Sequence, residues 1–324
     1  MTTSHRSLGS SDITVSAVGI GCNAFGTRID ADRTRAVVDA AFEHGITFFD
    51  TADTYGTGQS EQLLGEALKG RRDEVVIATK FGMDMQGVNG DDGGRRGTAA
   101  YVRTAAEASL KRLDSDHIDL YQLHTPDPST PIEETLGAMT ELLQEGKVRA
   151  IGSSNLQAWQ VVDADWVSRT TGLEAFVTAQ NEYSLYNRTA ETELVPACLE
   201  LGVGVLPYFP LAYGLLTGKY RRGEDAPAGT RLSVQTHRLA NADWDRIEAL
   251  ESFASARGIS ILDLAIGGLA AQPAVSSVIA GATGPEQVAA NAAAGAWTPA
   301  AEDLDELAAI GRATQSYTTF APQR

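Results

Sequence analysis

The chain carries the stretch Ile46-Thr47-Phe48-Phe49-Asp50-Thr51-Ala52-Asp53-Thr54-Tyr55-Gly56, in which an apolar β-type run ends at a carboxylate, Asp50. Lys80 ends the run 75–79 in the same way, His124 ends the run 118–123, and Tyr55 follows Asp50 closely. The carboxyl ends of parallel strands meet at one rim of a sheet or barrel, where active sites form. The sequence therefore predicts a site that contains Asp50, Tyr55, Lys80 and His124.

Short apolar runs alternate with longer amphipathic segments along the chain. This pattern predicts strands at residues 17–21, 46–50, 75–80, 118–123, 148–152, 175–180, 204–207 and 275–279. Helical patterns lie between them, for example at 36–44, 61–69, 99–112, 131–144, 192–201 and 261–270, and a β-hairpin over residues 7–15 comes first. The expected fold is an α/β (β/α)8 barrel, a TIM barrel. Since no Pro/Ser-rich linker divides the chain, residues 1–324 are expected to form a single domain.

Two segments are longer than an ordinary connection. Residues 82–97 follow the third predicted strand and residues 211–238 follow the seventh, so both are expected on the C-terminal rim. Long loops in a compact domain are usually functional or disordered. We expect the first to form a wall of the substrate pocket and the second to form a strap over a cofactor. The other expected pocket walls are Cys22, Asn23, Phe25 and the tail near Tyr317 and Phe320.

Composition restricts the partners. The formal net charge of −16 argues against non-specific binding to nucleic acid or to an anionic membrane. No apolar run approaches the roughly 18 residues of a membrane helix, and the N-terminus does not resemble a secretory signal. The two cysteines, Cys22 and Cys198, have no CxxC partner and suit a reducing cytoplasm. A cytoplasmic location without a nucleic-acid or membrane partner is therefore expected.

The sequence does not support two other kinds of site. The histidines show no HxH or HxxxH spacing and the acidic residues form no ligand cluster with them, so no metal site is predicted. The segment Gly19-Ile20-Gly21-Cys22-Asn23-Ala24 matches the G-x-G-x-x-G/A pattern of a Rossmann dinucleotide site. However, residues 25–30 intervene before a helix can start. The glycines are instead expected to end the first strand in a tight turn.

Six motifs in register carry a family resemblance: the stretch around Asp50 and Tyr55, Ala78-Thr79-Lys80, Tyr121-Gln122-Leu123-His124, Ile151-Gly152-Ser153-Ser154-Asn155, Gln180-Asn181-Glu182-Tyr183-Ser184 and Leu215-Leu216-Thr217-Gly218-Lys219. With them the chain resembles the aldo-keto reductases, which are NAD(P)H-dependent carbonyl reductases on a TIM barrel. It is most similar to the bacterial branch near the potassium-channel β-subunits. The resemblance covers nearly the whole chain, from Leu8 to about Ala309.

Carbonyl reduction requires hydride delivery to carbon and a proton for the developing alkoxide. A tyrosine hydroxyl titrates near 10, and a neighbouring ammonium such as Lys80 favours its phenolate form. Asp50 would keep a buried Lys80 charged. A neutral His124 can hydrogen-bond the carbonyl and polarise it. The resemblance implies the same four roles, with Tyr55 as the proton donor.

The resemblance also implies cofactor contacts. Ser154, Asn155 and Gln180 would hold the nicotinamide carboxamide, and Tyr208 would stack under the nicotinamide ring. Pro210, Leu211, Gly214 and Lys219 match the pyrophosphate loop. The adenosine end would receive Arg231, Gly281, Thr283, Gln287 and Asn291, partly at a helix N-terminus that suits an anion.

The chain departs from the wider family at two positions. Ala290 stands where many members have a glutamate, and Phe209 replaces a common serine. Many members also place Lys or Arg around Gly281 and Gln287 to grip the 2′-phosphate. The channel-β branch has Ser/Thr and Gln at these positions instead. NADPH is therefore the expected cofactor, and NADH stays an alternative.

The expected function is NADPH-dependent reduction of an aldehyde or ketone. Three alternatives remain open at this point. The first is the reverse reaction, as an alcohol or sugar dehydrogenase, and the second is a nucleotide-sensing regulatory subunit. The third, a sugar isomerase on the same barrel, would normally show metal ligands, and none is visible in the sequence.

Overall fold

The computed structural model describes residues 4–90 and 92–311, and within them eight parallel strands neighbour one another in chain order. These strands are β3 (Val18–Gly21), β4 (Phe48–Asp50), β5 (Val76–Phe81), β6 (Ile118–Leu123), β7 (Val148–Ser154), β8 (Thr178–Gln180), β9 (Gly204–Val205) and β10 (Val278–Gly281). β10 pairs with β3 at one end of this order. The other end closes where the Val205 N–H donates to the Ala274 carbonyl at 2.7 Å and the Ile279 N–H donates to the Pro207 carbonyl at 3.0 Å. The predicted (β/α)8 barrel is confirmed.

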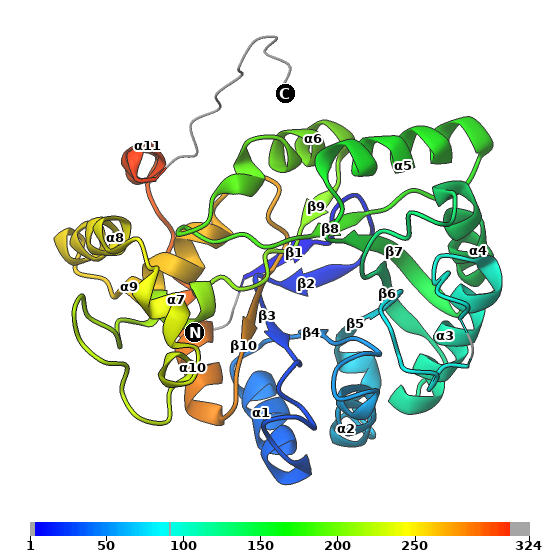
Figure 1. Cartoon of the computed structure of the whole chain (residues 1–324), viewed down its shortest axis with the longest axis horizontal. Coiled ribbons are helices and arrows are strands. Elements are labelled where there is room, and N and C mark those ends of the chain that lie inside the picture. The colour runs from blue at the N-terminus through cyan, green and yellow to red at the C-terminus, as the bar shows by residue number, and fades with distance from the viewer. Residues whose placement is uncertain (1–3, 91, 312–324) are drawn as a thin grey trace.

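Helices surround the strands (Figure 1). They are α1 (Ala31–Glu43), α2 (Gln59–Ala67), α3 (Ala99–Leu113), α4 (Ile132–Gln144), α5 (Ala158–Thr171), α6 (Leu194–Leu201), α7 (Thr236–Ala240), α8 (Trp244–Ala256), α9 (Ile261–Asp263), α10 (Pro285–Ala294) and α11 (Ala301–Ala309). Short 3₁₀ turns are η1 (Arg72–Glu74), η2 (Thr189–Glu191), η3 (Ala212–Thr217) and η4 (Arg231–Ser233), and η5 (Leu264–Gly268) is a π-helical turn.

Several boundaries differ from the sequence prediction. α1 starts at Ala31, earlier than the predicted 36, because the Asp30 carboxylate caps it by accepting from the Arg33 N–H at 3.0 Å. The strand predicted at 275–279 begins only at Val278. Val275 instead bridges to Val205 on β9, and the chain then crosses to pair with β3. The strand predicted at 175–180 is likewise shorter, since β8 begins at Thr178.

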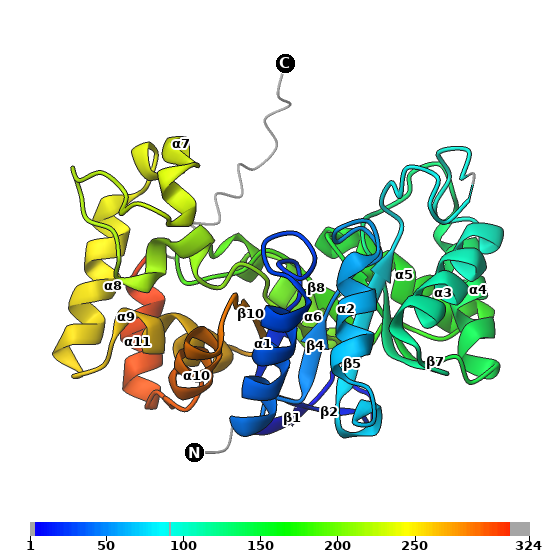
Figure 2. The same ribbon diagram turned by 90° about the horizontal axis from the view of Figure 1, so that it is seen from below.

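The barrel interior has its own apolar core. Phe48, Val76, Ala78, Leu120 and Ala150 point inward from successive strands and are buried together. The N-terminal hairpin, β1 (His5–Ser7) with β2 (Thr14–Ser16), closes this core from below with its buried side chains Leu8, Ile13 and Val15. Figure 2 shows the hairpin at one end of the molecule and α7 at the other. The open end of the barrel is therefore the one that carries the strands' carboxyl ends.

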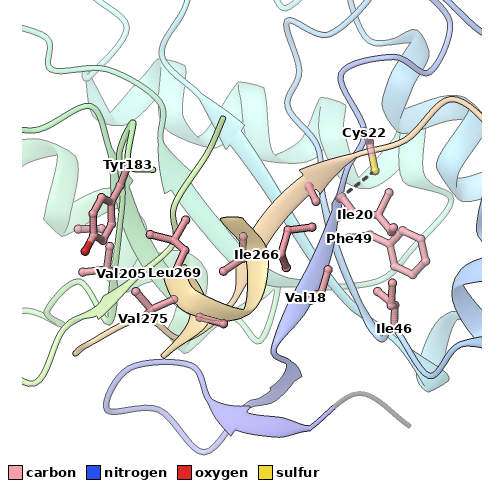
Figure 3. Close-up of a cluster of buried hydrophobic side chains, with 14 of the residues drawn as sticks. Val18, Ile20, Cys22, Ile46, Phe49, Tyr183, Val205, Ile266, Leu269 and Val275 are labelled. Atoms are coloured by element: carbon pink, nitrogen blue, oxygen red, sulfur yellow. Dashed lines mark hydrogen bonds between the residues drawn. The ribbon is translucent and has the colours of Figure 1, made fainter. Parts of the chain in front are cut away.

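A second core fills the space between strands and helices. Side chains alternate along a strand, so Val18 and Ile20 of β3 and Phe49 of β4 point outward and pack against the surrounding helices (Figure 3). Figure 3 also shows Cys22 in this layer, where its thiol contacts the Ile20 carbonyl at 3.6 Å. The same alternation turns the neighbouring residue of each strand into the barrel, which places Asp50 and Lys80 inside.

The two long rim segments differ in structure. Residues 82–90 and 92–97 form turns without a helix or strand. The segment 211–238 is more ordered than expected of a loop, because it contains η3, η4 and the start of α7. No helix in the described residues is long and apolar enough to cross a membrane.

A buried ion pair ties α2 to α3 and provides a test of the fold. The Arg112 Nε donates to the Glu61 carboxylate at 2.6 Å, and the Glu61 side chain is fully buried. Arg112→Ala leaves that carboxylate without its charged partner and should lower the free energy of unfolding by about 3–5 kcal/mol.

The matched control for this substitution is Arg103→Ala, which breaks exposed ion pairs to Glu141 and Glu145 and should cost about 0–1 kcal/mol. Urea unfolding of the two variants measures the difference. Equal decreases in the free energy of unfolding would show that the buried pair contributes no more to stability than the exposed pairs do.

Candidate active site

A buried ion pair forms the floor of the open end of the barrel. The Lys80 Nζ lies 2.7 Å from the Asp50 Oδ2, and Lys80 is 0% exposed. The ammonium also donates to the Thr51 carbonyl at 2.7 Å. Burial alone would lower the pKa of Lys80, but Asp50 and Tyr55 raise it, and the net shift is upward. Lys80 is therefore a fixed positive charge beneath the cavity.

Two glutamines complete this polar layer. The Gln180 Nε2 donates to the Asp50 Oδ1 at 2.8 Å, and the Gln122 Nε2 donates to the same oxygen at 3.3 Å. In the sheet register Lys80 pairs with Gln122, whereas Asp50 pairs with Ala78. The stagger between strands, together with these hydrogen bonds, therefore brings the glutamines to Asp50. Gln122 was quoted in a motif but not assigned a role; the structure places it as a support for Asp50.

Tyr55 lies directly above the ion pair. Its hydroxyl is 3.5 Å from the Lys80 Nζ, and that ammonium is 5.1 Å from the centre of the Tyr55 ring. Burial raises the pKa of Tyr55, whereas Lys80 lowers it and Asp50 raises it, so the net shift is upward. The expected effect of Lys80 on the phenol is present, but in this cavity it offsets only part of the cost of burying a phenolate.

His124 faces Tyr55 across the same floor. The two ring centres are 6.0 Å apart in an edge-on arrangement, and His124 is 6% exposed. Burial, followed by the charge of Lys80, lowers the pKa of His124 to about 3. Its Nδ1 is buried without a hydrogen-bond partner in the described part of the chain. The imidazole is therefore neutral at ordinary pH and can act as a hydrogen-bond donor or acceptor.

A cavity of about 810 Å³ opens above this floor. Asp50, Tyr55 and His124 line it, whereas Lys80 lies beneath the surface. Every residue predicted to contact a cofactor also lines it: Ser154, Asn155, Gln180, Tyr208, Pro210, Leu211, Gly214, Lys219, Arg231, Gly281, Thr283, Gln287 and Asn291. The structure thus brings together residues from five strand ends and the long segment after β9.

Amide and hydroxyl groups cluster near Tyr55. The Tyr208 hydroxyl donates to the Asn155 Oδ1 at 2.8 Å, and the Asn155 Nδ2 donates to the Ser154 Oγ at 3.1 Å and to the His124 carbonyl at 2.9 Å. Asn155 adopts a left-handed backbone conformation, φ 59°. Such strain at a non-glycine residue occurs where a side chain must be aimed at a site.

Cations line the far end of the cavity. Lys219, Arg231 and Arg28 form no ion pair with any carboxylate in the described residues, although the chain is strongly acidic. Burial and the nearby Arg231 lower the pKa of Arg28. Arg28, on the loop after β3, was missed by sequence reasoning because no motif marks it. Unneutralised cations that face one cavity fit a phosphate-bearing ligand.

The turn after β10 adds neutral groups to this end. The Gln287 Oε1 accepts from the Thr283 N–H at 2.7 Å and from its hydroxyl at 3.1 Å, which leaves the amide nitrogen of Gln287 free to donate outward. The Asn291 Nδ2 is buried with no partner in the described residues. Both groups therefore retain hydrogen-bonding capacity that a ligand could use.

The segment after β9 has an unusual backbone. Phe209, Ala212 and Tyr213 all have positive φ values, of 54°, 46° and 62°. The Phe209 ring packs against Tyr208 and Tyr213, with centres 5.0 Å and 4.4 Å away. Left-handed conformations in three non-glycine residues cost energy and cluster at ligand sites.

Some expected pocket walls lie elsewhere. Cys22 and Phe25 are fully buried in the outer core and do not line the cavity, because packing beyond the end of β3 sets the direction of their side chains. Asn23 does line it, and so does Met83 from the described part of the 82–97 segment. Tyr317 and Phe320 lie outside the described residues.

A buried polar network behind the site was also missed. Asp53 is fully buried, and its Oδ2 accepts from the Asn89 Nδ2 at 3.1 Å. The Asn89 Oδ1 in turn accepts from Arg112 at 3.0 Å. Burial and the nearby Glu61 raise the pKa of Asp53 to about 8, although Arg112 opposes them. The network ties the 82–97 segment to the turn that carries Tyr55.

No group of three or more His, Cys, Asp or Glu side chains in residues 4–90 and 92–311 is placed to hold a metal ion. Both cysteines are unpaired and buried.

Comparison with known proteins agrees with this geometry. The model of the aldo/keto reductase family matches residues 17–312. The chain belongs to the aldo/keto reductase family. The structure of aldo-keto reductase AKR11C1 from Bacillus halodurans, in its holo form, is similar with a TM-score of 0.77 and 34% identity, over 95% of this chain and 96% of that one. The expected family and fold are confirmed, and the chain is an oxidoreductase.

Some relatives are named as enzymes and others as subunits of an ion channel. A probable voltage-gated potassium channel subunit beta of Oryza sativa is 35% identical over 89% of each chain. The uncharacterized oxidoreductase YrpG of Bacillus subtilis is 36% identical over 87% of each chain. Probable aldo-keto reductase 1 of Glycine max is 39% identical over 75% of this chain and 71% of its own.

The lowered pKa of His124 predicts an acid-dependent loss of stability. As pH falls below about 6.5, the His124 imidazole becomes protonated in the unfolded state, whereas in the folded state it stays neutral until about pH 3. This residue alone should therefore reduce the free energy of unfolding by up to about 1.4 kcal/mol per pH unit in that window.

Denaturant unfolding of the wild type and His124→Gln at several pH values measures this slope as the difference between the two proteins, because the raised pKa of Asp53 contributes in the opposite direction to both. His124→Gln should remove it, whereas His237→Gln, on the exposed face of α7, should keep it. A wild-type slope that persists in His124→Gln would contradict a neutral buried imidazole.

Proposed function

We propose that this aldo/keto reductase reduces an aldehyde or ketone to an alcohol with NADPH, and that Tyr55 donates the proton. The observation that carries the proposal is the position of the Tyr55 hydroxyl, 3.5 Å from a buried ammonium that Asp50 keeps charged, at the floor of the cavity. When bound, the reduced nicotinamide supplies the hydride. The remaining requirements, orientation and proton transfer, fall to the residues of this chain.

Orientation is assigned to His124 and Tyr55 together. Their side chains face each other across the floor, so a carbonyl oxygen between them can accept a hydrogen bond from each. The neutral imidazole polarises the carbonyl but does not take up the proton that Tyr55 donates, because the pKa of His124 is lowered to about 3. The carbonyl carbon then faces the Ser154, Asn155 and Tyr208 end of the cavity.

The proton passes from the Tyr55 hydroxyl to the oxygen as it becomes an alkoxide. The O–H bond of the phenol breaks, the O–H bond of the product alcohol forms, and the phenolate that remains is stabilised by Lys80. Asp50 holds Lys80 in place, and Gln122 and Gln180 hold Asp50. Solvent returns the proton to Tyr55 after the product leaves.

The fit to a phosphorylated dinucleotide rests on the cations and amides at the far end. Lys219 would meet the pyrophosphate, and Arg231 with the free amide of Gln287 would meet the adenosine 2′-phosphate. Asn291 offers an unpartnered amide deeper in the cavity. NADH would lose the contacts to the 2′-phosphate and bind more weakly, but it would keep the rest.

Two alternatives use the same site. In the first, the site oxidises an alcohol or sugar, and the phenolate of Tyr55 then accepts the proton. In the second, the protein is a slow nucleotide sensor, which the similarity to a probable voltage-gated potassium channel subunit beta of Oryza sativa supports. Steady-state turnover with a carbonyl panel, together with assay of nucleotide retained through purification, separates an enzyme from a sensor. We also propose a reducing cytoplasm as the compartment, because both thiols are unpaired.

Tyr55→Phe removes the proton and keeps the ring. The rate of reduction should fall about 10²–10⁴-fold, the usual contribution of general acid catalysis, while the Kd for NADPH stays nearly unchanged. Single-turnover kinetics and fluorescence titration measure the two quantities. Tyr55 would not be the proton donor if the variant kept more than half of the wild-type rate for a substrate whose chemical step limits turnover.

Arg231→Ala should reduce the preference for NADPH. One charge-assisted hydrogen bond contributes roughly 1.5–3 kcal/mol, which corresponds to about a 10- to 150-fold difference in Kd between NADPH and NADH. Raised salt should narrow the difference. The control is Arg222→Ala on the same segment, which breaks an exposed pair with Glu248 and should change neither Kd. Equal weakening of both cofactors by Arg231→Ala would place this arginine at the pyrophosphate or adenine instead.

A further inference from the structure

Helix α5 carries an apolar stripe on its outer face. Trp159, Val162 and Trp166 are 62%, 45% and 66% exposed. Within the described residues, the other large hydrophobic side chains of comparable exposure are Val88, Leu199 and Val234, and Leu199 lies on α6, which packs beside α5. Figure 1 shows α5 and α6 on the outside of the barrel. Exposed tryptophans on one stripe are typical of an interaction surface.

The stripe is not the face that α5 uses in its own fold. Val161, Ala164 and Ser168 are the buried residues of this helix and pack toward the barrel. The exposed set lies on the opposite side, so α5 has an apolar stripe on each side. Only one of them is covered within the described residues. This is also why its sequence lacks the one-sided apolar pattern of an ordinary surface helix.

The spacing of the exposed stripe is that of a coiled-coil seam. Trp159, Val162, Trp166 and Arg169 alternate three and four residues apart, which are the a and d positions of a heptad. The order is also self-complementary when two such helices run antiparallel. Trp159 and Arg169 are equally distant along the helix from Ala164, and so are Val162 and Trp166. Each a position of one copy then meets a d position of the other.

The side chains that meet in this register match chemically. Val162 packs against Trp166 of the second copy. Arg169 meets Trp159 of the second copy, where a guanidinium over an indole face gives a cation–π contact. The Arg169 side chain is 63% exposed and pairs with Asp165 at 2.8 Å, which directs it along the helix. The Trp159 Nε1 donates to the Gln157 Oε1 at 2.7 Å, which fixes the exposed ring.

We propose that this face of α5 is a homodimer interface, in which α5 packs antiparallel against α5 of a second copy about a two-fold axis level with Ala164. A two-fold interface requires a surface that complements itself, and the a/d order of the stripe meets this requirement. The cavity opens at the carboxyl ends of the strands, whereas the seam runs along the side of the barrel. Both active sites therefore stay accessible.

Area and charge set the expected strength. A tryptophan buries about 150–250 Å² in full, so the partly exposed seam provides on the order of half of the roughly 800 Å² per partner of a standard interface. Each copy also carries a formal charge of −16, and Asp163 would lie level with Asp165 of the second copy. The dimer should therefore be weak and should tighten as salt screens this repulsion.

Sedimentation of the full-length protein tests the dimer. The wild type should show reversible association from 34.3 kDa to twice that mass, and it should be stronger at about 0.5 M than at about 0.05 M salt, where the Debye length is longer. Trp166→Glu should give a monomer. Val88→Glu is the control, because Val88 is exposed at 55% on the 82–97 segment and should leave the association unchanged.

An exchange of side chains tests the antiparallel register itself. Trp159→Arg alone brings two guanidinium groups together at each end of the seam and should weaken association at least about tenfold. Adding Arg169→Trp to this variant restores one aromatic and one cation at each end, and association should return to within a few-fold of the wild type. Thermal unfolding of each variant checks that the barrel is intact.

Three results would overturn the proposal. They are a wild type that sediments as a monomer at the highest soluble concentration, a dimer that survives Trp166→Glu, and a double exchange that stays as weak as Trp159→Arg. The last result would mean that the copies meet through another register or another face. None of these measurements depends on the proposed carbonyl reduction.

Discussion

The ion pair between Lys80 and Asp50 is the interaction on which the site depends. An ammonium with no exposed surface loses its proton unless a carboxylate lies beside it, and here the two atoms are 2.7 Å apart. The pair holds a positive charge beneath the Tyr55 hydroxyl, and the charge of Lys80 adds to burial in lowering the pKa of His124. If the pair were missing, the phenol would be a buried weak acid with nothing to stabilise its anion.

The barrel places that pair by simple alternation. In β4 and β5, inward residues follow one another two apart, so Phe48 is succeeded by Asp50, and Ala78 by Lys80. An apolar layer thus lies below a polar layer, and the hairpin closes the bottom. Gln122 and Gln180 then reach Asp50 across the barrel and donate to its second carboxylate oxygen. Fold and chemistry are linked through this one layer.

Much of this arrangement could be predicted from sequence, because it depends on local signals. Apolar runs that end in Asp50, Lys80 and His124 mark strand ends, and every residue proposed for cofactor contact lines the cavity. What sequence did not indicate depends on tertiary contacts. Arg28 becomes relevant only because its loop lies beside Arg231, and Asp53 only because Asn89 folds back onto it. Cys22 and Phe25 were placed wrongly, because the direction of a side chain beyond a strand end is set by packing.

The central claim is that Lys80, kept charged by Asp50, sets the acidity of the Tyr55 hydroxyl. The pH dependence of single-turnover reduction in Lys80→Met and in Lys80→Met/Asp50→Asn, beside the wild type, tests it most directly. The double variant keeps the interior free of an unpaired charge. The account predicts that the apparent pKa of the catalytic acid rises in both variants, or moves above the pH range that can be measured. The reduction rate of the double variant should be only slightly lower than that of Lys80→Met. An unchanged pH profile in variants that fold and bind NADPH normally would contradict it.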